Sequence, residues 1–171
     1  SQAVERLAER AGIQLKPVRR VAPRANGQAA EVDPNRLAKL NRWAMEFFRQ
    51  CLEDADKGRT ARDYLVRRGI SPESIGTWRL GVAPNAVDAL ARAAAARKIP
   101  TDLLQQGGFI AGMGQDKFVN RLMFPITDVT ARVIGFGGRT LNDTGAKYIN
   151  SPTTPLFDKS NTLYGLEQIG R

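Results

Sequence analysis

The sequence contains no histidine and a single cysteine, Cys51, among its 171 residues. One thiol cannot form an internal disulfide, and without imidazole none of the usual mixed Cys/His zinc sites is possible. Any metal would therefore have to be held by carboxylates. Because no histidine is present to activate it, we interpret Cys51 as a small core residue of a predicted helix instead of a nucleophile.

Long apolar segments and nucleotide-binding loops are also missing. No stretch approaches the roughly 18 apolar residues that a membrane span needs, and the N-terminus shows no signal-peptide pattern. The glycine cluster at 135–138 lacks the spacing of a dinucleotide fingerprint, and no Gly-Lys-Ser/Thr completes a P-loop. We therefore expect a cytoplasmic protein without a membrane partner. The cluster itself indicates a twisted or bulged strand that other groups approach closely, in preference to a ligand loop.

Basic residues are in excess, with 26 Lys and Arg against 17 Asp and Glu and a net charge of +9. This balance favours a polyanionic partner, and nucleic acid over membrane, although ordinary solubilising charge accounts for a modest excess equally well. The excess lies mainly at the two ends. Residues 1–24 hold six bases and two acids, residues 25–116 thirteen and eleven, and residues 117–171 seven and four.

The first 106 residues are mainly helical in pattern. Residues 3–11 predict a short amphipathic helix, and residues 16–32, with two prolines and no apolar period, predict a flexible linker. Asp33-Pro34 then places an N-cap before a first-turn proline. The inward face of the helix that follows contains Leu37, Leu40, Ala44, Phe47, Phe48 and Cys51.

Shorter elements follow this long helix. A capping-box pattern at 60–63 opens a helix that ends at Gly69, and Ser71-Pro72 opens another. A short strand is predicted at 80–83, and further helices at 87–98 and 100–106. Strand-forming runs at 121–126 and 132–139, separated by the turn 128–131, predict a β-hairpin. A helical first half and a small twisted sheet make an α+β fold.

Basic and polar residues surround an aromatic residue in the last third of the chain. In an extended segment Tyr148 and Asn150 share one face, whereas Lys147 points the other way. A stacking ring, an amide and flanking cations such as Arg139 and Lys159 are the components of a single-strand-binding groove. A solvated loop with Tyr148 in the core fits the spacing equally well.

Several blocks of sequence occur in an order that resembles one protein family. The blocks KFVNRLMFPITDVTARVIGFGGRTL (117–141), KYINSP (147–152) and LFDKSNTLYGL (156–166) are similar to the bacterial replicative DNA primases, in the basic N-terminal subdomain of the RNA-polymerase core. ARDYLVRRGIS and IGTWRLGVAP resemble the same subdomain less sharply. The resemblance implies that residues 1–15 end a zinc-binding module, 16–32 form a linker, and 33–171 form the basic subdomain without the TOPRIM part that follows it.

The resemblance also implies a function. Primases are DNA-directed RNA polymerases that make short RNA primers on single-stranded DNA, using nucleotides, Mg²⁺ or Mn²⁺ in the TOPRIM part and Zn²⁺ in the upstream module. No catalytic residue, metal ligand or cofactor is therefore expected in this chain. The basic subdomain guides the template and the RNA/DNA hybrid toward the metals. Carried over by position, that role falls to Arg62, Arg139, Lys147, Tyr148, Asn150 and Lys159.

Two other functions stay open at this point. A non-enzymatic single-strand-binding module would share the basic surface, and so would a domain that docks an acidic partner such as the replicative helicase. Two departures from the family pattern concern the turn at 128–131, which lacks the usual charged, glycine-containing sequence, and Thr153, which replaces an acidic residue. We expect the isolated chain to be monomeric and catalytically inert.

Overall fold

The structure is a computed structural model that describes residues 32–158. The predicted helix at 3–11 and, apart from Val32, the predicted linker at 16–32 lie outside these residues, and both stay predictions. The elements in chain order are α2 (Pro34–Glu53), α3 (Arg59–Arg67), α4 (Pro72–Thr77), β1 (Gly81–Ala83), α5 (Ala89–Ala96), α6 (Thr101–Gln106), η1 (Gly112–Gly114), β2 (Arg121–Thr127), β3 (Val133–Thr140) and β4 (Tyr148–Asn150).

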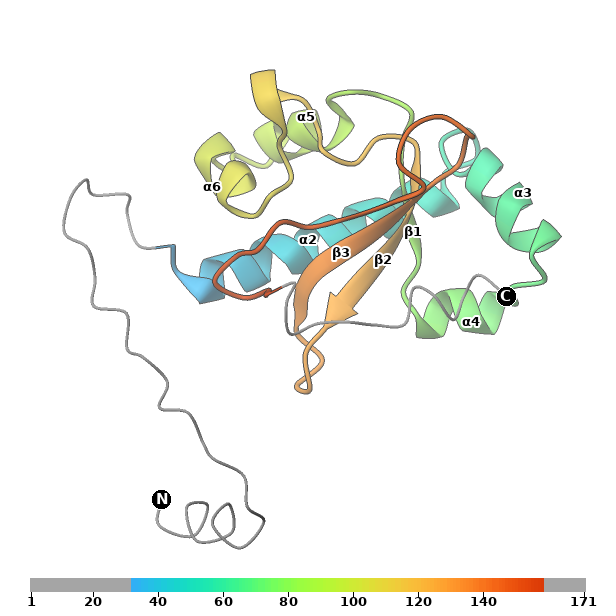
Figure 1. The fold of residues 1–171 in the computed structure, drawn as a ribbon, viewed down its shortest axis with the longest axis horizontal. Coiled ribbons are helices and arrows are strands. Elements are labelled where there is room, and N and C mark those ends of the chain that lie inside the picture. The colour runs from blue at the N-terminus through green and yellow to red at the C-terminus, as the bar shows by residue number, and fades with distance from the viewer. Residues whose placement is uncertain (1–31, 159–171) are drawn as a thin grey trace, which may run out of the picture. The chain divides into compact units, whose positions relative to one another are not determined.

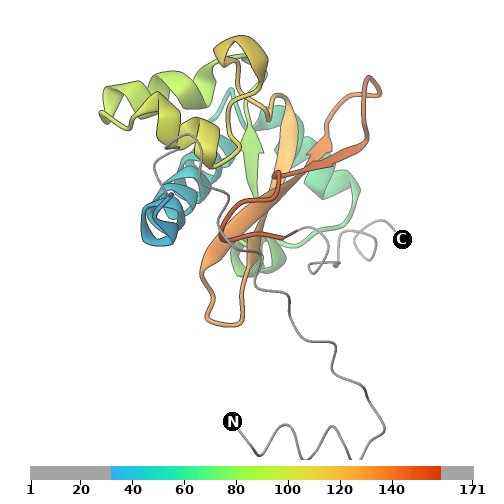
Figure 2. The same cartoon turned by 60° about the vertical axis from the view of Figure 1, so that its left-hand side comes forward.

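The strands form one antiparallel sheet in the order β1-β2-β3-β4. Helix α2 covers one face, where its apolar residues share a core cluster with α5, α6 and the strands (Figures 1 and 2). Helix α3 packs on the opposite face, in a second cluster that contains Leu65, Val82, Leu122 and Phe124. This arrangement of mainly helical elements before a small antiparallel sheet confirms the predicted α+β class.

Helix α2 begins where the sequence predicts. The Asp33 carboxylate accepts a hydrogen bond from the Asn35 N–H at 2.9 Å, and Pro34 occupies the first turn. The predicted inward face is buried except for Phe47, which is half-buried and contacts both clusters. Cys51 is buried as expected, and this burial raises the pKa of its thiol to about 11.

The capping box predicted at 60–63 was wrong. Helix α3 begins at Arg59 after Gly58, with no side-chain cap, so Thr60 already lies inside the helix. The turn before it is too tight for a side chain, because a Cβ on Gly58 would lie 2.0 Å from the Leu52 carbonyl oxygen. The predicted stop at Gly69 is confirmed: its φ is +67°, and the next N–H, from Ile70, donates to the Leu65 carbonyl at 3.1 Å.

The β2–β3 hairpin is confirmed, and its glycines accommodate neighbouring side chains. A Cβ on Gly135 would lie 3.2 Å from the Phe157 ring, and one on Gly138 would lie 3.0 Å from the Phe118 ring. The register shifts between Ile126 and Thr127, which is the irregularity expected of a bulge. The glycine cluster therefore serves close packing, as predicted.

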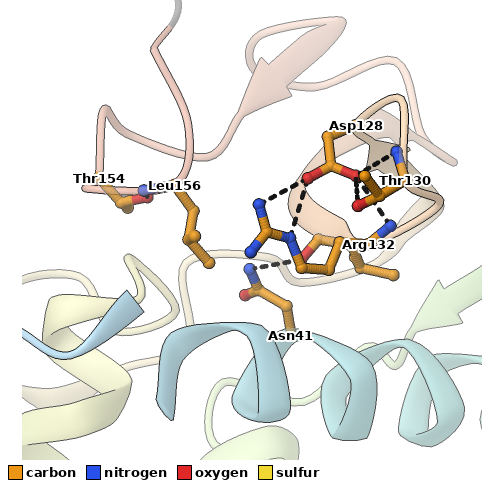
Figure 3. Close-up of polar contacts among 7 residues, drawn as sticks. Asn41, Asp128, Thr130, Arg132, Thr154 and Leu156 are labelled. Atoms are coloured by element: carbon orange, nitrogen blue, oxygen red, sulfur yellow. Dashed lines mark hydrogen bonds and ion pairs between the residues drawn. The ribbon is translucent and has the colours of Figure 1, made fainter. Parts of the chain in front are cut away.

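The turn at 128–131 is closed by the Asp128 carboxylate (Figure 3). Oδ1 accepts from the backbone and hydroxyl of Thr130 and from the Arg132 N–H, and Oδ2 accepts from the Arg132 guanidinium. One residue further, the Val133 carbonyl accepts from Nδ2 of the buried Asn41 at 3.1 Å, which ties the hairpin to α2. The turn is thus closed by a carboxylate, and Ala131 takes a positive φ of +62° in it.

Candidate nucleic-acid interface

The pairing of β3 with β4 places three of the predicted residues on one face of the sheet. Arg139 lies opposite Tyr148, and Gly137 opposite Asn150. Opposite residues in an antiparallel pair share a face, so Arg139, Tyr148 and Asn150 lie together. Ile149 belongs to the core cluster under α2, so this shared face is the one away from α2. The expectation that Tyr148 and Asn150 share a face is confirmed.

The Arg139 guanidinium contacts two tyrosine rings. Its Cζ lies 5.2 Å from the Tyr148 ring centroid and 5.3 Å from that of Tyr64 on α3, and Nη1 donates to the Tyr148 hydroxyl. Arg68 Cζ lies 5.3 Å from the Tyr64 centroid, and Lys147 Nζ lies 5.9 Å from the Tyr148 centroid. We call these five residues, which alternate cation and ring from α3 to β4, the cation–ring ladder.

Lys147 does not point away from Tyr148, so that expectation was wrong. Strand β4 begins only at Tyr148, and Lys147 lies in the bend before it, where the alternation of a strand does not apply. Its ammonium therefore reaches over the neighbouring ring. Tyr148 itself is half-buried.

Arg62 is not part of this cluster. Its guanidinium donates to the backbone carbonyls of Leu52, Asp54 and Ala55, the last two at 2.7 and 2.9 Å, and so binds the C-terminal end of α2. Residues two apart on a helix do not share a face, so Arg62 and Tyr64 point in different directions. Its predicted contact with DNA stays a prediction. Lys159, the other predicted cation, lies outside the described residues.

Tyrosine rings, and not carboxylates, are the partners found for the cations of the ladder within residues 32–158. The ion pairs found within residues 32–158 join carboxylates to Arg49, Lys57, Arg92 and Arg132. None of those pairs involves a residue of the ladder. The ladder therefore presents positive charge that tyrosine rings contact and no carboxylate in that part of the chain neutralises.

Arg121 supports the ladder from the other face and was missed by sequence reasoning. Its Nη1 donates to the carbonyls of Gly138 at 3.2 Å and Ala146 at 2.9 Å, and its burial lowers the pKa of the guanidinium. The Thr140 N–H donates to the Lys147 carbonyl at 3.0 Å. These bonds fix the loop at 141–146, and with it the position from which Lys147 extends.

Tyr64 and Arg68 were also missed. Their spacing of four residues on one helix is a signal that the sequence does carry, because such residues are neighbours on a helix surface. Their link to Arg139 depends instead on how α3 packs against the sheet, which no local pattern reveals.

The described residues 32–158 offer no candidate site for a metal ion. No group of three or more Cys, Asp or Glu side chains among residues 32–158 is placed to hold an ion, and the whole sequence has no histidine. Within the same range, no helix has the length and apolarity to cross a membrane.

Comparison with known proteins shows the family. Residues 47–170 match the family model of the DNA primase catalytic core, N-terminal domain, and the chain belongs to this family. The DNA primase of Halalkalibacterium halodurans is 36% identical over 98% of this chain and 28% of its own length. This chain thus spans under a third of that relative. The resemblance identified from the sequence is confirmed.

Solved structures agree with this assignment. A DnaG primase catalytic domain bound to single-stranded DNA matches with a TM-score of 0.69 and 37% identity, over 77% of this chain and 44% of that one. The Aquifex aeolicus primase, with zinc-binding and RNA polymerase domains, matches with a TM-score of 0.66 and 28% identity, over 96% of this chain and 38% of that one.

Proposed function

We propose that this chain is the template-guiding part of a DNA primase, which synthesises short RNA primers on single-stranded DNA for replication in the cytoplasm. In this proposal the chemistry belongs to other parts of the parent protein, where nucleotides and Mg²⁺ or Mn²⁺ act. Zn²⁺ belongs to an upstream module, and the replicative helicase binds elsewhere. The isolated chain is monomeric and inert, and its task is to hold template and RNA/DNA hybrid.

The cation–ring ladder is the observation that carries this proposal. It combines three cations without carboxylate partners in the described chain and two tyrosine rings. Cations hold the phosphates of a single strand and rings stack on its bases, with little dependence on sequence. A related catalytic domain has been solved with single-stranded DNA bound, which supports a template role for this region.

The geometry suggests how a strand would be held. Arg139 donates to the Tyr148 hydroxyl, which leaves the proton of that hydroxyl free to bind a phosphate or sugar oxygen. Lys147 is exposed and has a flexible stem, so its ammonium can leave the Tyr148 ring when a base stacks there. Asn150, exposed on the same face, would offer its amide to the next nucleotide.

Titration of labelled single-stranded DNA at several salt concentrations tests the proposal. Lys147→Gln should reduce the slope of log affinity against log salt by about 0.7, the value for one phosphate contact. Tyr148→Ala should weaken binding by about 1–3 kcal/mol without lowering the melting temperature, as expected for a stacked base. Lys98→Gln, an exposed change at the end of α5 on the α2 side, is the matched control.

Four outcomes would contradict the proposal or a part of it. Salt-independent affinity would exclude phosphate contacts, and a Tyr148→Ala variant that unfolds while Lys147→Gln is silent would place the tyrosine in the core. Equal binding of polyglutamate would instead support a domain that docks acidic proteins. Primer synthesis by the isolated chain with template, Mg²⁺ and nucleotides would disprove its inertness.

A further inference from the structure

The N-terminal half of helix α2 presents three cations to solvent. Arg36, Lys39 and Arg42 are all exposed and follow one another at intervals of three residues. Each is therefore a neighbour of the next on the helix surface, with Cβ atoms about 5–6 Å apart. None of the ion pairs found within residues 32–158 involves any of them. We call these three residues the α2 stripe.

The C-terminal half of the same helix has balanced charges. The Arg49 guanidinium lies 3.9 Å from the Glu46 carboxylate and 3.2 Å from that of Glu53, at the same intervals of three and four residues. Residues 34–45, which include the stripe, contain no Asp or Glu. Carboxylates on α2 thus neutralise Arg49 and leave the stripe without a counter-charge on its own helix.

The order of charges along α2 opposes the helix dipole. Carboxylates stabilise the first turn of a helix and cations the last, but α2 has no acidic residue in its first turn and no basic residue in its last. Asp33 is the N-cap, so Arg36 occupies the third helical position, where a glutamate would complete a capping box. Like charges at these intervals also repel one another. The stability of the helix therefore does not explain the stripe.

The stripe is separate from the cation–ring ladder. Helix α2 covers one face of the sheet, and the ladder lies on the other (Figures 1 and 2). The two surfaces also differ in composition. The aromatic residues of α2, which are Trp43, Phe47 and Phe48, belong to the core cluster or pack against it, and none is exposed. The stripe can hold a polyanion through its charges, but it offers no exposed ring on which unpaired bases could stack.

The polyanion that matches these features is a nucleic-acid duplex. Its bases are already paired and stacked on one another, so phosphate contacts alone can hold it. The sequence leading into the stripe is also basic, because residues 16–42 contain seven Lys and Arg against two acids. Basic segments of this kind are typical of chains that bind nucleic acid.

We propose that the α2 stripe binds the sugar-phosphate backbone of a duplex, which for this chain is the RNA/DNA hybrid formed during primer synthesis. The inference rests on the proposed function, because that function supplies the hybrid. Arg36, Lys39 and Arg42 each contact a phosphate, while the ladder holds single-stranded template. The chain thus binds the two forms of nucleic acid on opposite faces of its sheet.

Charge removal in the 171-residue chain tests these contacts. Labelled blunt-ended RNA/DNA hybrid and labelled oligothymidylate are each titrated at several salt concentrations. Lys39→Gln and Arg42→Gln should each reduce the salt slope for the hybrid by about 0.9, the value for one phosphate contact with a duplex, and leave the slope for oligothymidylate unchanged. Arg59→Gln removes an exposed charge at the start of α3 and is the matched control, which should change neither slope.

Arg36 provides a second test, because stability and binding should change in opposite directions. Arg36→Glu completes the capping box and places a carboxylate in the first turn, so the melting temperature should rise. The same change puts a negative charge among the phosphate contacts, so affinity for the hybrid should fall, and by more than in Arg36→Gln. A lower melting temperature with unchanged affinity would show that Arg36 serves the fold and would overturn the inference.

Failure of this inference is distinguishable from failure of the proposed function. The inference is overturned if the wild type does not bind the hybrid, or if Lys39→Gln and Arg42→Gln keep its salt slope. It is also overturned if both variants reduce the oligothymidylate slope equally, or if polyglutamate displaces the hybrid at equal charge concentration. Template binding by the ladder is decided separately, by the effects of Lys147→Gln and Tyr148→Ala on oligothymidylate.

Discussion

The backbone of Phe136 is paired with Ser151 through both of its polar groups. The Phe136 N–H donates to the Ser151 hydroxyl at 2.9 Å, and the Phe136 carbonyl accepts from the Ser151 N–H at 2.8 Å. Phe136 contacts the rings of Phe48 and Phe109 in the core, whereas Ser151 directly follows the exposed Asn150. This pair therefore connects the candidate interface to the aromatic core.

Ser151→Ala is expected to destabilise the protein. Ser151 is 2% exposed, so alanine would leave a buried N–H without its acceptor, at a cost of about 1–3 kcal/mol. Urea unfolding followed by circular dichroism measures this loss. Thr153→Ala removes a hydroxyl from an exposed residue of the same segment and should change the midpoint little. Equal midpoints for the two variants would show that the hydroxyl bond contributes nothing.

Gly108→Ala is expected to destabilise the fold for two separate reasons. The φ of Gly108 is +73°, which costs an alanine roughly 1–2 kcal/mol, and the new Cβ would lie 2.2 Å from the Pro152 ring. Thermal unfolding should show a clearly lower midpoint. Gly112→Ala is the control, because it has open space around it and no positive φ. A Gly108→Ala variant as stable as Gly112→Ala would mean that the segment after β4 shifts freely.

Features of the fold that depend on adjacent residues were predictable. The Asp33-Pro34 start of α2 and the stop at Gly69 are encoded within a few residues, and the structure has both. Helix α5 differs, because its first N–H groups, from Leu90 and Ala91, donate to the carboxylate of the distant Asp116. A cap supplied from another part of the chain leaves no local signal, so the predicted start at residue 87 was two residues early.

The candidate site also has some features that neighbouring residues predict and others that only tertiary packing decides. Strand alternation was enough to place Tyr148 and Asn150 on one face, because both lie within β4. Alternation failed for Lys147, which lies just outside the strand. The contact of Tyr64 with Arg139 joins α3 to β3 through tertiary packing, and no spacing in the sequence predicts it.

The Asp128 carboxylate in the turn at 128–131 is expected to make the free energy of unfolding depend on pH in the acidic range. Hydrogen bonds from Thr130 and Arg132 lower the pKa of Asp128 below its ordinary value of 3.8. The charged Asp128 carboxylate therefore stabilises the folded protein at pH values above the pKa that Asp128 has in the unfolded chain. This stabilisation is lost as the pH falls through the lower pKa that Asp128 has in the folded protein. Asp128→Asn should be less stable than the wild type at pH 7, and the difference should shrink below about pH 4.

Urea unfolding of the wild type and of Asp128→Asn at several pH values measures how the difference in their stability depends on pH. Asp143→Asn, which removes one carboxylate from the exposed loop before β4, serves as the control for the loss of a charge. The role of the charged carboxylate would be contradicted if the wild type and Asp128→Asn differed in unfolding free energy by the same amount from pH 7 to pH 3.

Substitutions of Arg62 should change the stability of the protein and not its DNA binding, because the Arg62 guanidinium already has three backbone partners. Arg62→Gln removes donors from the carbonyls of Leu52, Asp54 and Ala55, and we expect a loss of about 1–3 kcal/mol in unfolding free energy. Arg62→Lys keeps the charge but cannot reproduce this planar fork, so it should be nearly as destabilised.

If Arg62 also contacts DNA, as its place in the sequence block predicts, then Arg62→Gln alone should reduce the salt slope, by about 0.7. Because three backbone carbonyls already hold the guanidinium in place, we expect both variants to be less stable and to keep the wild-type slope. A stable Arg62→Gln variant with a reduced slope would instead place Arg62 in the candidate nucleic-acid interface.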